Sequence, residues 1–200
     1  TEKLLDEIGL RWRYVGPINL IAGTDVATSF LEPDELMQFL SGRLGDAYIA
    51  NPSTLATKLQ RASGNAGADG RYGLNDFFCR DNTWRASVHA LAERSDAVLM
   101  DLRSFSAANR GCEFELGLLL EYVALEKITF LIDSTTDVAH LEKVLTAMWQ
   151  QHGARGVNAA ATQPVLHLFR SEKHGDGLVD NLLHRLFGLA QGGTKLAANT

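Results

Sequence analysis

Short apolar runs alternate along this chain with longer segments whose apolar residues recur every three or four positions. The short runs are rich in Ile, Leu and Val and show little polar alternation, which is typical of strands buried on both faces of a sheet. These runs predict five strands, at 17–23, 47–50, 96–102, 127–133 and 164–169.

The periodic segments predict amphipathic helices. Glu32 and Pro33 suit the start of one helix, and Asp81 is a good N-cap for another. Between helices, residues 63–73 hold too many glycines for anything but a loop. The predicted helices cover 32–44, 52–62, 81–94, 111–124, 138–148 and 176–190.

Strands that alternate with helices favour an open parallel sheet with right-handed connections and helices on both faces. The sequence therefore predicts an α/β fold of three layers, a flavodoxin-like open parallel sheet with strand order 2-1-3-4-5. With 200 residues, of which 46% are hydrophobic, the chain suits one core. We expect one domain over 17–190, an N-terminal lead segment over 1–16 that can follow further chain, and a flexible tail over 191–200.

The predicted strand order indicates where in the fold a ligand would bind. In an open parallel sheet, ligands bind beyond the carboxyl ends of the strands, where the strand order reverses. Here the reversal falls between the first and third strands, which are followed by the loops 23–29 and 103–111. We expect both loops to border the crevice, together with the helix that the second loop enters.

One charged residue interrupts an apolar stripe of that helix. Glu115 lies three, four or seven positions from Cys112, Leu118, Leu119 and Tyr122. A charge on such a stripe is costly unless a partner or a ligand meets it. Two explanations follow: Glu115 enters the crevice as a functional carboxylate, or it is a buried carboxylate satisfied by an arginine or by backbone N–H groups.

Other candidates follow the first and third strands. Gly23, Thr24 and Asp25 lack the glycine pattern of a Rossmann fingerprint or a P-loop, so Gly23 either lets a ribose or phosphate approach the backbone or forms a plain turn. Arg103 can meet a phosphate through its planar guanidinium or form a surface ion pair. Glu113, on the other side of its helix from Glu115, is expected to be an ordinary solvated residue.

Two aromatic side chains are candidates for contact with a base. Tyr72 follows Asp69 and Arg71 in the sequence DGRYG, a combination that can stack on a base or close over a site, although loops also have this composition by chance. Trp84 fits a helix face, where it is either a stacking platform or part of the core.

Charge and cysteine use narrow the function classes. A net charge of -5 does not favour nucleic acid as a partner. Cys79 and Cys112 show no disulfide or metal spacing, which favours a reducing, cytoplasmic setting, and no His motif predicts a metal site. No apolar run approaches the roughly 20 residues that cross a bilayer. The aromatic and basic segment 11–14 leaves open that this is the soluble domain of a membrane-anchored protein, with a tether outside the sequence.

The stretch RASVHALAERSDAVLMDLRSFSAANRGCEFEL resembles the centre of a TIR domain, where a helix and a strand lead to a polar loop and then to Cys-x-x-Glu-Leu. Cys112, Glu115 and Leu116 match that last element. The resemblance implies that Glu115 cleaves the nicotinamide–ribose bond of NAD, with NAD as the substrate and no cofactor, in a self-associating domain of signalling or defence. The nucleotide site would be lined by Gly23, Thr24, Asp25, Arg103, Ser106 and Asn109, with Tyr72 or Trp84 stacking on a base.

The same residues are similar to the Gly-x-x-x-Glu-x-Gly of nucleoside 2-deoxyribosyltransferases, through Gly111, Glu115 and Gly117. In that family the glutamate is the nucleophile, and a first strand ending in Ala-Gly, as at 22–23, is usual. The chain departs from the TIR pattern at Gly111, where a tryptophan is common, and at 18–19, where an acidic and an aromatic residue are usual.

A single carboxylate suits NAD better than a nucleoside. Cleavage of a ribosyl–nitrogen bond creates an oxocarbenium-like sugar, and nicotinamide leaves from a cationic ring without a proton. A neutral base would need an acid, which Asp25 or Asp69 would have to supply. The sequence therefore favours NAD cleavage and leaves two alternatives, a non-enzymatic self-association module and a nucleoside-processing enzyme.

Overall fold

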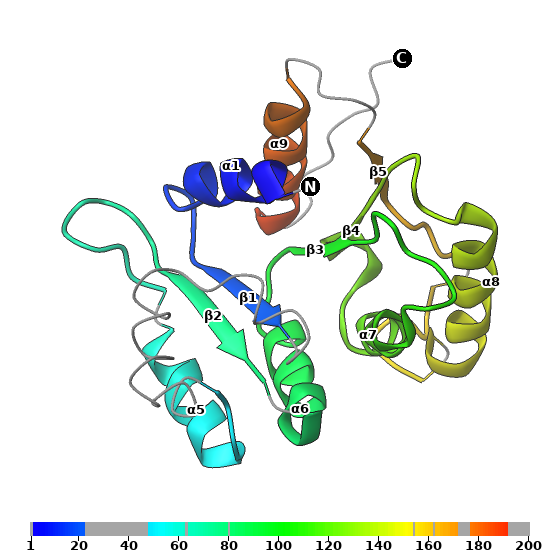
Figure 1. The fold of residues 1–200 in the computed structure, drawn as a ribbon, viewed down its shortest axis with the longest axis horizontal. Helices are drawn as coiled ribbons and strands as arrows, with labels where there is room; N and C mark the ends of the chain where they lie inside the picture. Colours follow the sequence, from blue (N-terminus) through cyan, green and yellow to red (C-terminus); the bar gives the residue numbers. More distant parts are fainter. Residues whose placement is uncertain are drawn as a thin grey trace. The chain divides into compact units, whose positions relative to one another are not determined.

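Helices and parallel strands alternate along the chain in a computed structural model that describes residues 2–22, 48–62, 64–79, 81–153, 155–161, 163–171 and 177–191 (Figure 1). The chain forms two compact units, Thr1–Leu91 and Ala92–Thr200. The helix predicted at 32–44 lies outside the described residues.

The first unit holds a two-stranded parallel sheet. Strand β1 (Ile18–Ala22) pairs with strand β2 (Leu74–Phe78) in a continuous register from Ile18 opposite Leu74 to Ala22 opposite Phe78. Its described helices are α1 (Glu2–Trp12), α5 (Pro52–Arg61) and α6 (Asp81–Ala92).

The core of this unit forms where α5 and α6 meet the sheet. Asn51 caps α5, because its Oδ1 accepts a hydrogen bond from Thr54 N, and Pro52 fits the first helical turn, where no N–H partner is needed. The buried cluster consists of Ile49, Leu55, Phe77, Cys79 and Leu91.

The strand predicted at 47–50 is wrong. Among its described residues only Ile49 forms a β-bridge, to Cys79 just beyond β2. Gly73 O accepts from Ile18 N, and Phe78 O accepts from Ile49 N. Consecutive residues of a strand expose their backbone groups on alternate edges, so these two bonds lie on opposite edges of β2. The unpredicted strand β2 therefore separates Ile49 from β1.

The lead segment contains a helix that the sequence analysis does not predict. Residues 2–12 form α1, in which Leu4 and Ile8 are buried. Their i, i+4 spacing places both side chains on one helix face. That spacing is the sequence signal for this helix.

The second unit holds a three-stranded parallel sheet in the order β3-β4-β5. Between the first and second strands of this unit lie a helix and a 3-10 turn. Between its second and third strands lie a further helix and a π-helical turn. In chain order the elements are β3 (Val98–Asp101), α7 (Arg110–Tyr122), η1 (Leu125–Lys127), β4 (Ile128–Ile132), α8 (Val138–Met148), η2 (Trp149–Gly153), β5 (Leu168–Arg170) and α9 (Leu178–Ala190).

Strand β4 is the centre of this unit, with every residue buried. Arg185 of α9 donates to Thr129 Oγ1 (3.2 Å), so the side chain of Thr129 points to the face that α9 covers. Phe130 and its even-numbered neighbours face the other way. Right-handed crossovers place both α7 and α8 on that second face, where the two helices pack against each other (Figure 1).

The predicted fold class is confirmed: the strands are parallel and flanked by helices, consistent with an open α/β flavodoxin-like fold. The predicted order 3-4-5 holds for the second unit, although the strand expected at 164–169 is shortened to Leu168–Arg170. In place of one five-stranded sheet, the described strands form sheets of two and three. Within the described ranges, no helix combines the length and apolar content needed to cross a membrane.

Gly156 lets the chain after η2 pass against the end of α7. A Cβ at this position would lie 1.8 Å from Glu121 O, the oxygen that accepts a hydrogen bond from Val157 N. Because that neighbour is backbone, Gly156→Ala should displace the chain and lower the free energy of unfolding by about 2 kcal/mol in urea denaturation. The control is Gly111→Ala, whose Cβ would meet no atom within 4 Å. An equal loss in both variants would contradict the packing role of Gly156.

Candidate functional site

Two loops lie at the carboxyl edge of the three-stranded sheet, 102–109 after β3 and 133–137 after β4. The buried hydroxyl of Thr136 joins them by donating to Leu102 O (3.0 Å). Ligands of parallel sheets bind at this edge. The two loops therefore form one braced surface, to which the predicted crevice loop 103–111 contributes, whereas residues 23–29 of the other predicted loop lie outside the described residues.

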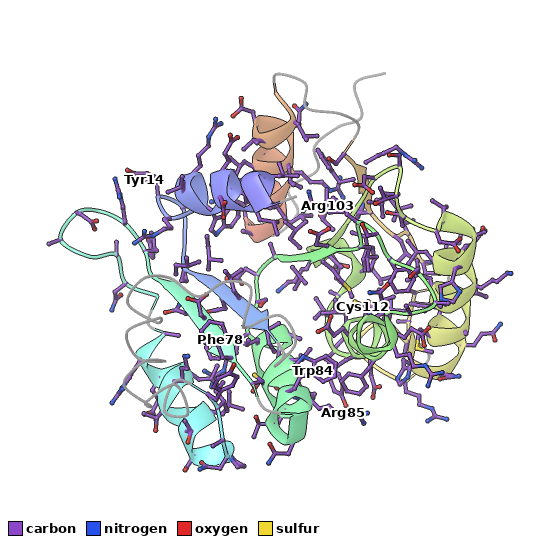
Figure 2. The ribbon with its side chains drawn as sticks, viewed as in Figure 1. Tyr14, Phe78, Trp84, Arg85, Arg103 and Cys112 are labelled. Atoms are coloured by element: carbon purple, nitrogen blue, oxygen red, sulfur yellow. The ribbon has the colours of Figure 1, made fainter. Side chains whose placement is uncertain are left out.

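Arg103 is held by Asp101 at this edge (Figure 2). Its Nε donates to Asp101 Oδ1 (2.8 Å) and its Nη2 to Asp101 Oδ2 (2.5 Å). These hydrogen bonds raise the pKa of Arg103 above its ordinary value, while burial opposes them. The Arg103 side chain is only 6% exposed and that of Asp101 is 27% exposed, so the ion pair is partly buried. Contact of Arg103 with a phosphate stays a prediction. The guanidinium would have to bind the phosphate and Asp101 at the same time.

Asp133 carries the second carboxylate of the edge. Its Oδ1 accepts from Thr135 N (2.9 Å) and from Thr135 Oγ1 (2.6 Å). The hydrogen bond from the Thr135 side chain lowers the pKa of Asp133, and the charge of Arg103 acts in the same direction.

This lowered pKa predicts a pH-dependent contribution to stability. Because the pKa of Asp133 is lower in the folded state, its contribution is complete above about pH 4, the ordinary range of an aspartate, and is lost as the pH falls through the folded-state value. Urea unfolding of wild type and Asp133→Asn should differ by about 1 kcal/mol or less at pH 7 and converge in acid. A difference that grows as the pH falls would contradict this assignment.

Glu115 lies in the second turn of α7, which begins after Asn109. It is half-buried, and the five residues that follow it, 116–120, are all buried. On its own stripe, Leu118 is buried whereas Tyr122 is exposed. Glu115 therefore lies at the boundary between the open start of the helix and its buried middle. Its catalytic role stays a prediction.

Glu113 is half-buried, its side chain is 34% exposed, and a histidine of α8 approaches it. Glu113 Oε1 lies 3.5 Å from His140 Nε2. The His140 ring stacks on Phe105, with centroids 5.6 Å apart, and its Nε2 is buried with no hydrogen-bond partner among the described residues. The first turns of α7 and α8 therefore lie close together here without a hydrogen bond between these two side chains.

Ser106 and Asn109 are brought together at the start of α7. Asn109 Oδ1 accepts from Ser106 N (2.9 Å) and from Ser106 Oγ (3.1 Å). Asn109 occupies the N-cap position, yet its side chain makes no capping bond to the helix. Two of the predicted substrate-binding residues thus share one turn directly before the helix of Glu115.

The predicted residues of the first unit fall in different places. Gly23, Thr24 and Asp25 lie outside the described residues. Trp84 is half-buried on α6 and packs against the buried core cluster of this unit. This placement agrees with the core alternative for Trp84.

Tyr72 lies at the amino edge of the β1-β2 sheet, whereas the predicted crevice lies beyond the carboxyl edge. Tyr72 N donates to Arg13 O (2.7 Å), and Arg13 Nε donates to Tyr72 O (2.9 Å). Next to it, the Arg71 guanidinium lies over the ring of Tyr14, 5.3 Å from its centroid. The loop before β2 is thereby tied to the turn before β1. The structure does not bring Tyr72 to the carboxyl edge of its sheet.

Gly117 has a packing role that needs no ligand. A Cβ here would lie 3.1 Å from side-chain atoms of His152 and Met148, so glycine lets η2 and α8 approach α7 closely. His152 Nδ1 lies 2.7 Å from Glu121 Oε2, and this hydrogen bond lowers the pKa of Glu121. The glycine that follows Glu115 in the transferase-like pattern is therefore accounted for by helix packing.

Sequence reasoning missed Asp101, Asp133 and His140. The two aspartates had a visible signal, because each follows an apolar run, VLM and FLI, at the carboxyl end of a predicted strand. His140 had no such signal in the sequence, because its approach to Glu113 depends on how α8 packs against α7.

Across the residues that the structure describes, no three His, Cys, Asp or Glu side chains gather closely enough to hold a metal ion. The chain matches no protein-family model, no curated protein and no solved structure.

Proposed function

We propose that this protein cleaves the nicotinamide–ribose bond of NAD, with Glu115 as the catalytic carboxylate. One observation carries the proposal. Glu115 is a half-buried carboxylate in the second turn of a helix that enters directly from the carboxyl edge of a parallel sheet. Parallel α/β sheets bind their ligands at this edge. The resemblance of Cys112, Glu115 and Leu116 to the TIR pattern supplies the substrate class.

The chemistry needs one negative charge beside the ribose. As the bond to nicotinamide lengthens, positive charge moves from the pyridinium ring to the sugar, and a fixed carboxylate stabilises the oxocarbenium-like transition state. Nicotinamide departs as a neutral molecule, so no proton donor is required. Water then adds to the sugar carbon and releases a proton, which gives ADP-ribose and nicotinamide.

The surroundings of the other carboxylates near the carboxyl edge of the sheet favour NAD over a nucleoside as the substrate. A neutral base would leave only after protonation by an acid. Asp101 is held by Arg103, and Glu113 lies against His140. The pKa of Asp133 is lowered, which makes it a poor acid at neutral pH. None of these described groups is arranged as a proton donor, whereas NAD needs none; Asp25, a candidate acid for a neutral base, lies outside the described residues.

The direct test is incubation of the concentrated, purified protein with NAD, followed by chromatographic measurement of free nicotinamide. We expect release by wild type and none above background by Glu115→Ala. The matched control is Glu142→Ala, at an exposed position of α8. Equal release by Glu115→Ala and wild type would refute the proposal.

A second substrate separates the alternatives. If the protein exchanges the base of a deoxynucleoside with free adenine, and leaves NAD intact, the transferase resemblance is the correct one. If neither substrate reacts and Glu115→Gln self-associates as wild type does, the domain acts as a non-enzymatic interaction module.

A further inference from the structure

A guanidinium, an imidazole and a hydroxyl lie together at the opposite, amino edge of the three-stranded sheet. Phe130 pairs with Leu168, and Phe130 N donates to His167 O (2.9 Å), so the residues one position earlier, Thr129 and His167, are neighbours across β4 and β5. Paired residues of a parallel ladder point to the same face. The His167 side chain therefore shares the face of Thr129, which is the face that α9 covers.

Arg185 of α9 reaches this pair. Its Nε donates to Thr129 Oγ1 (3.2 Å), and within the described part of the chain no carboxylate lies within the 4.0 Å of an ion pair. The side chain is half-buried. Among the described residues the guanidinium has a neutral hydroxyl as its partner, and a partly buried charge with such a partner is unfavourable, because its desolvation is not offset.

The pKa of Arg185 can be compared with that of Arg103, an arginine of the same chain that has a carboxylate partner. The bonds to Asp101 raise the pKa of Arg103, whereas burial lowers the pKa of Arg185. His167 responds to the same surroundings: burial lowers its pKa, and the charge of Arg185 adds to that effect, while Glu126 of η1 acts in the opposite direction. In the part of the chain that the structure describes, two groups that carry or accept positive charge are thus held together without a carboxylate paired to the arginine.

We propose that Arg185, His167 and Thr129 bind the phosphate group of a small phosphorylated molecule. The guanidinium supplies a planar pair of donors, the imidazole supplies a further donor, and the hydroxyl orients the arginine. The site lies at the amino ends of β4 and β5, whereas Glu115 follows the carboxyl end of β3. The proposal is therefore independent of NAD cleavage.

Inorganic phosphate is the probe. Phosphate should raise the melting temperature in a saturable way, compared with chloride at equal ionic strength, and should raise the pKa of His167 measured by NMR. Arg185→Met should weaken phosphate binding about tenfold or more, the loss expected for a charge-assisted hydrogen bond. The control is Arg170→Met, an exposed position of β5 that lies three residues from His167 and so on the other face. Equal effects of phosphate and chloride, or equal binding by both variants, would overturn the proposal.

The apo protein gives a second test. If no partner neutralises Arg185, Arg185→Met removes an uncompensated charge and should melt at the same or a higher temperature in chloride. A lower melting temperature would show that the arginine is held by the chain itself and would overturn the proposal. An Arg185→Met protein that does not fold would overturn the proposal in the same way. Arg185→Lys keeps the charge and removes the planar guanidinium, so its phosphate affinity measures whether that planar group matters.

Discussion

Asn158→Ala should lower the free energy of unfolding by about 3 kcal/mol, since three hydrogen bonds of a buried amide are lost together. Asn158 is 6% exposed. Its Nδ2 donates to Leu120 O and to Val123 O, both at 2.8 Å, and its Oδ1 accepts from Leu125 N (3.1 Å). These partners are the last carbonyls of α7 and the first N–H group of η1, which helix geometry leaves without internal partners.

Urea unfolding followed by far-UV circular dichroism measures this effect. Asn82→Ala is the matched control, because Asn82 is exposed near the start of α6, and exposed substitutions usually change stability by about 0.5 kcal/mol or less. A loss in Asn158→Ala no larger than that of the control would show that water replaces the amide at no cost. The capping role of Asn158 would then be wrong.

Glu115→Gln should reduce the turnover of NAD by about a hundredfold or more, the scale on which loss of one charge-stabilising group acts. The amide retains the size and hydrogen-bonding shape of the carboxylate and removes only its charge. Because that charge is needed in the transition state and not for binding, kcat should fall while the affinity for NAD changes little. Initial rates of nicotinamide release, measured over a range of NAD concentrations, separate the two effects.

Two controls accompany this variant. Glu142→Gln makes the same chemical change at an exposed position of α8 and should keep the wild-type rate. Glu113→Gln makes the same change two residues earlier, beside His140, and should have a smaller effect than Glu115→Gln, since Glu113 lies on the other side of α7 from Glu115. A rise in KM with unchanged kcat in Glu115→Gln would mean that the residue binds the substrate and does not take part in the chemistry.

The second half of the fold could be predicted because its core has a simple pattern. Residues 128–132 are apolar apart from Thr129 and are buried without exception. Such a run has few alternatives to a central parallel strand. The helix at 138–148 begins and ends where its apolar spacing predicts.

The first half could not be predicted so well, because its strands are only partly covered. Strand β2 has the sequence LNDFF, with an exposed Leu74 and half-buried Asn75 and Asp76, so only its last residues carry a core signal. The glycine-rich stretch before it adds to a loop-like appearance. Conversely, the apolar run at 47–50 yields a single bridge at Ile49.

The candidate site, too, could be predicted from the sequence only in part. The sequence indicates that Arg103 and Glu115 lie near one sheet edge, because both positions follow directly from element order. It does not indicate that Asp101 holds Arg103 in a partly buried pair, or that His140 approaches Glu113. Both contacts depend on side-chain directions that are fixed only when loops and helices pack.

The measurement that tests the central claim most directly is a crystal structure of Glu115→Gln with NAD bound. The account predicts that the side chain of residue 115 lies about 3–3.5 Å from the ribose, the separation of reacting groups in an active site. NAD bound elsewhere, or a side chain at position 115 turned into the protein interior away from the nucleotide, would contradict it.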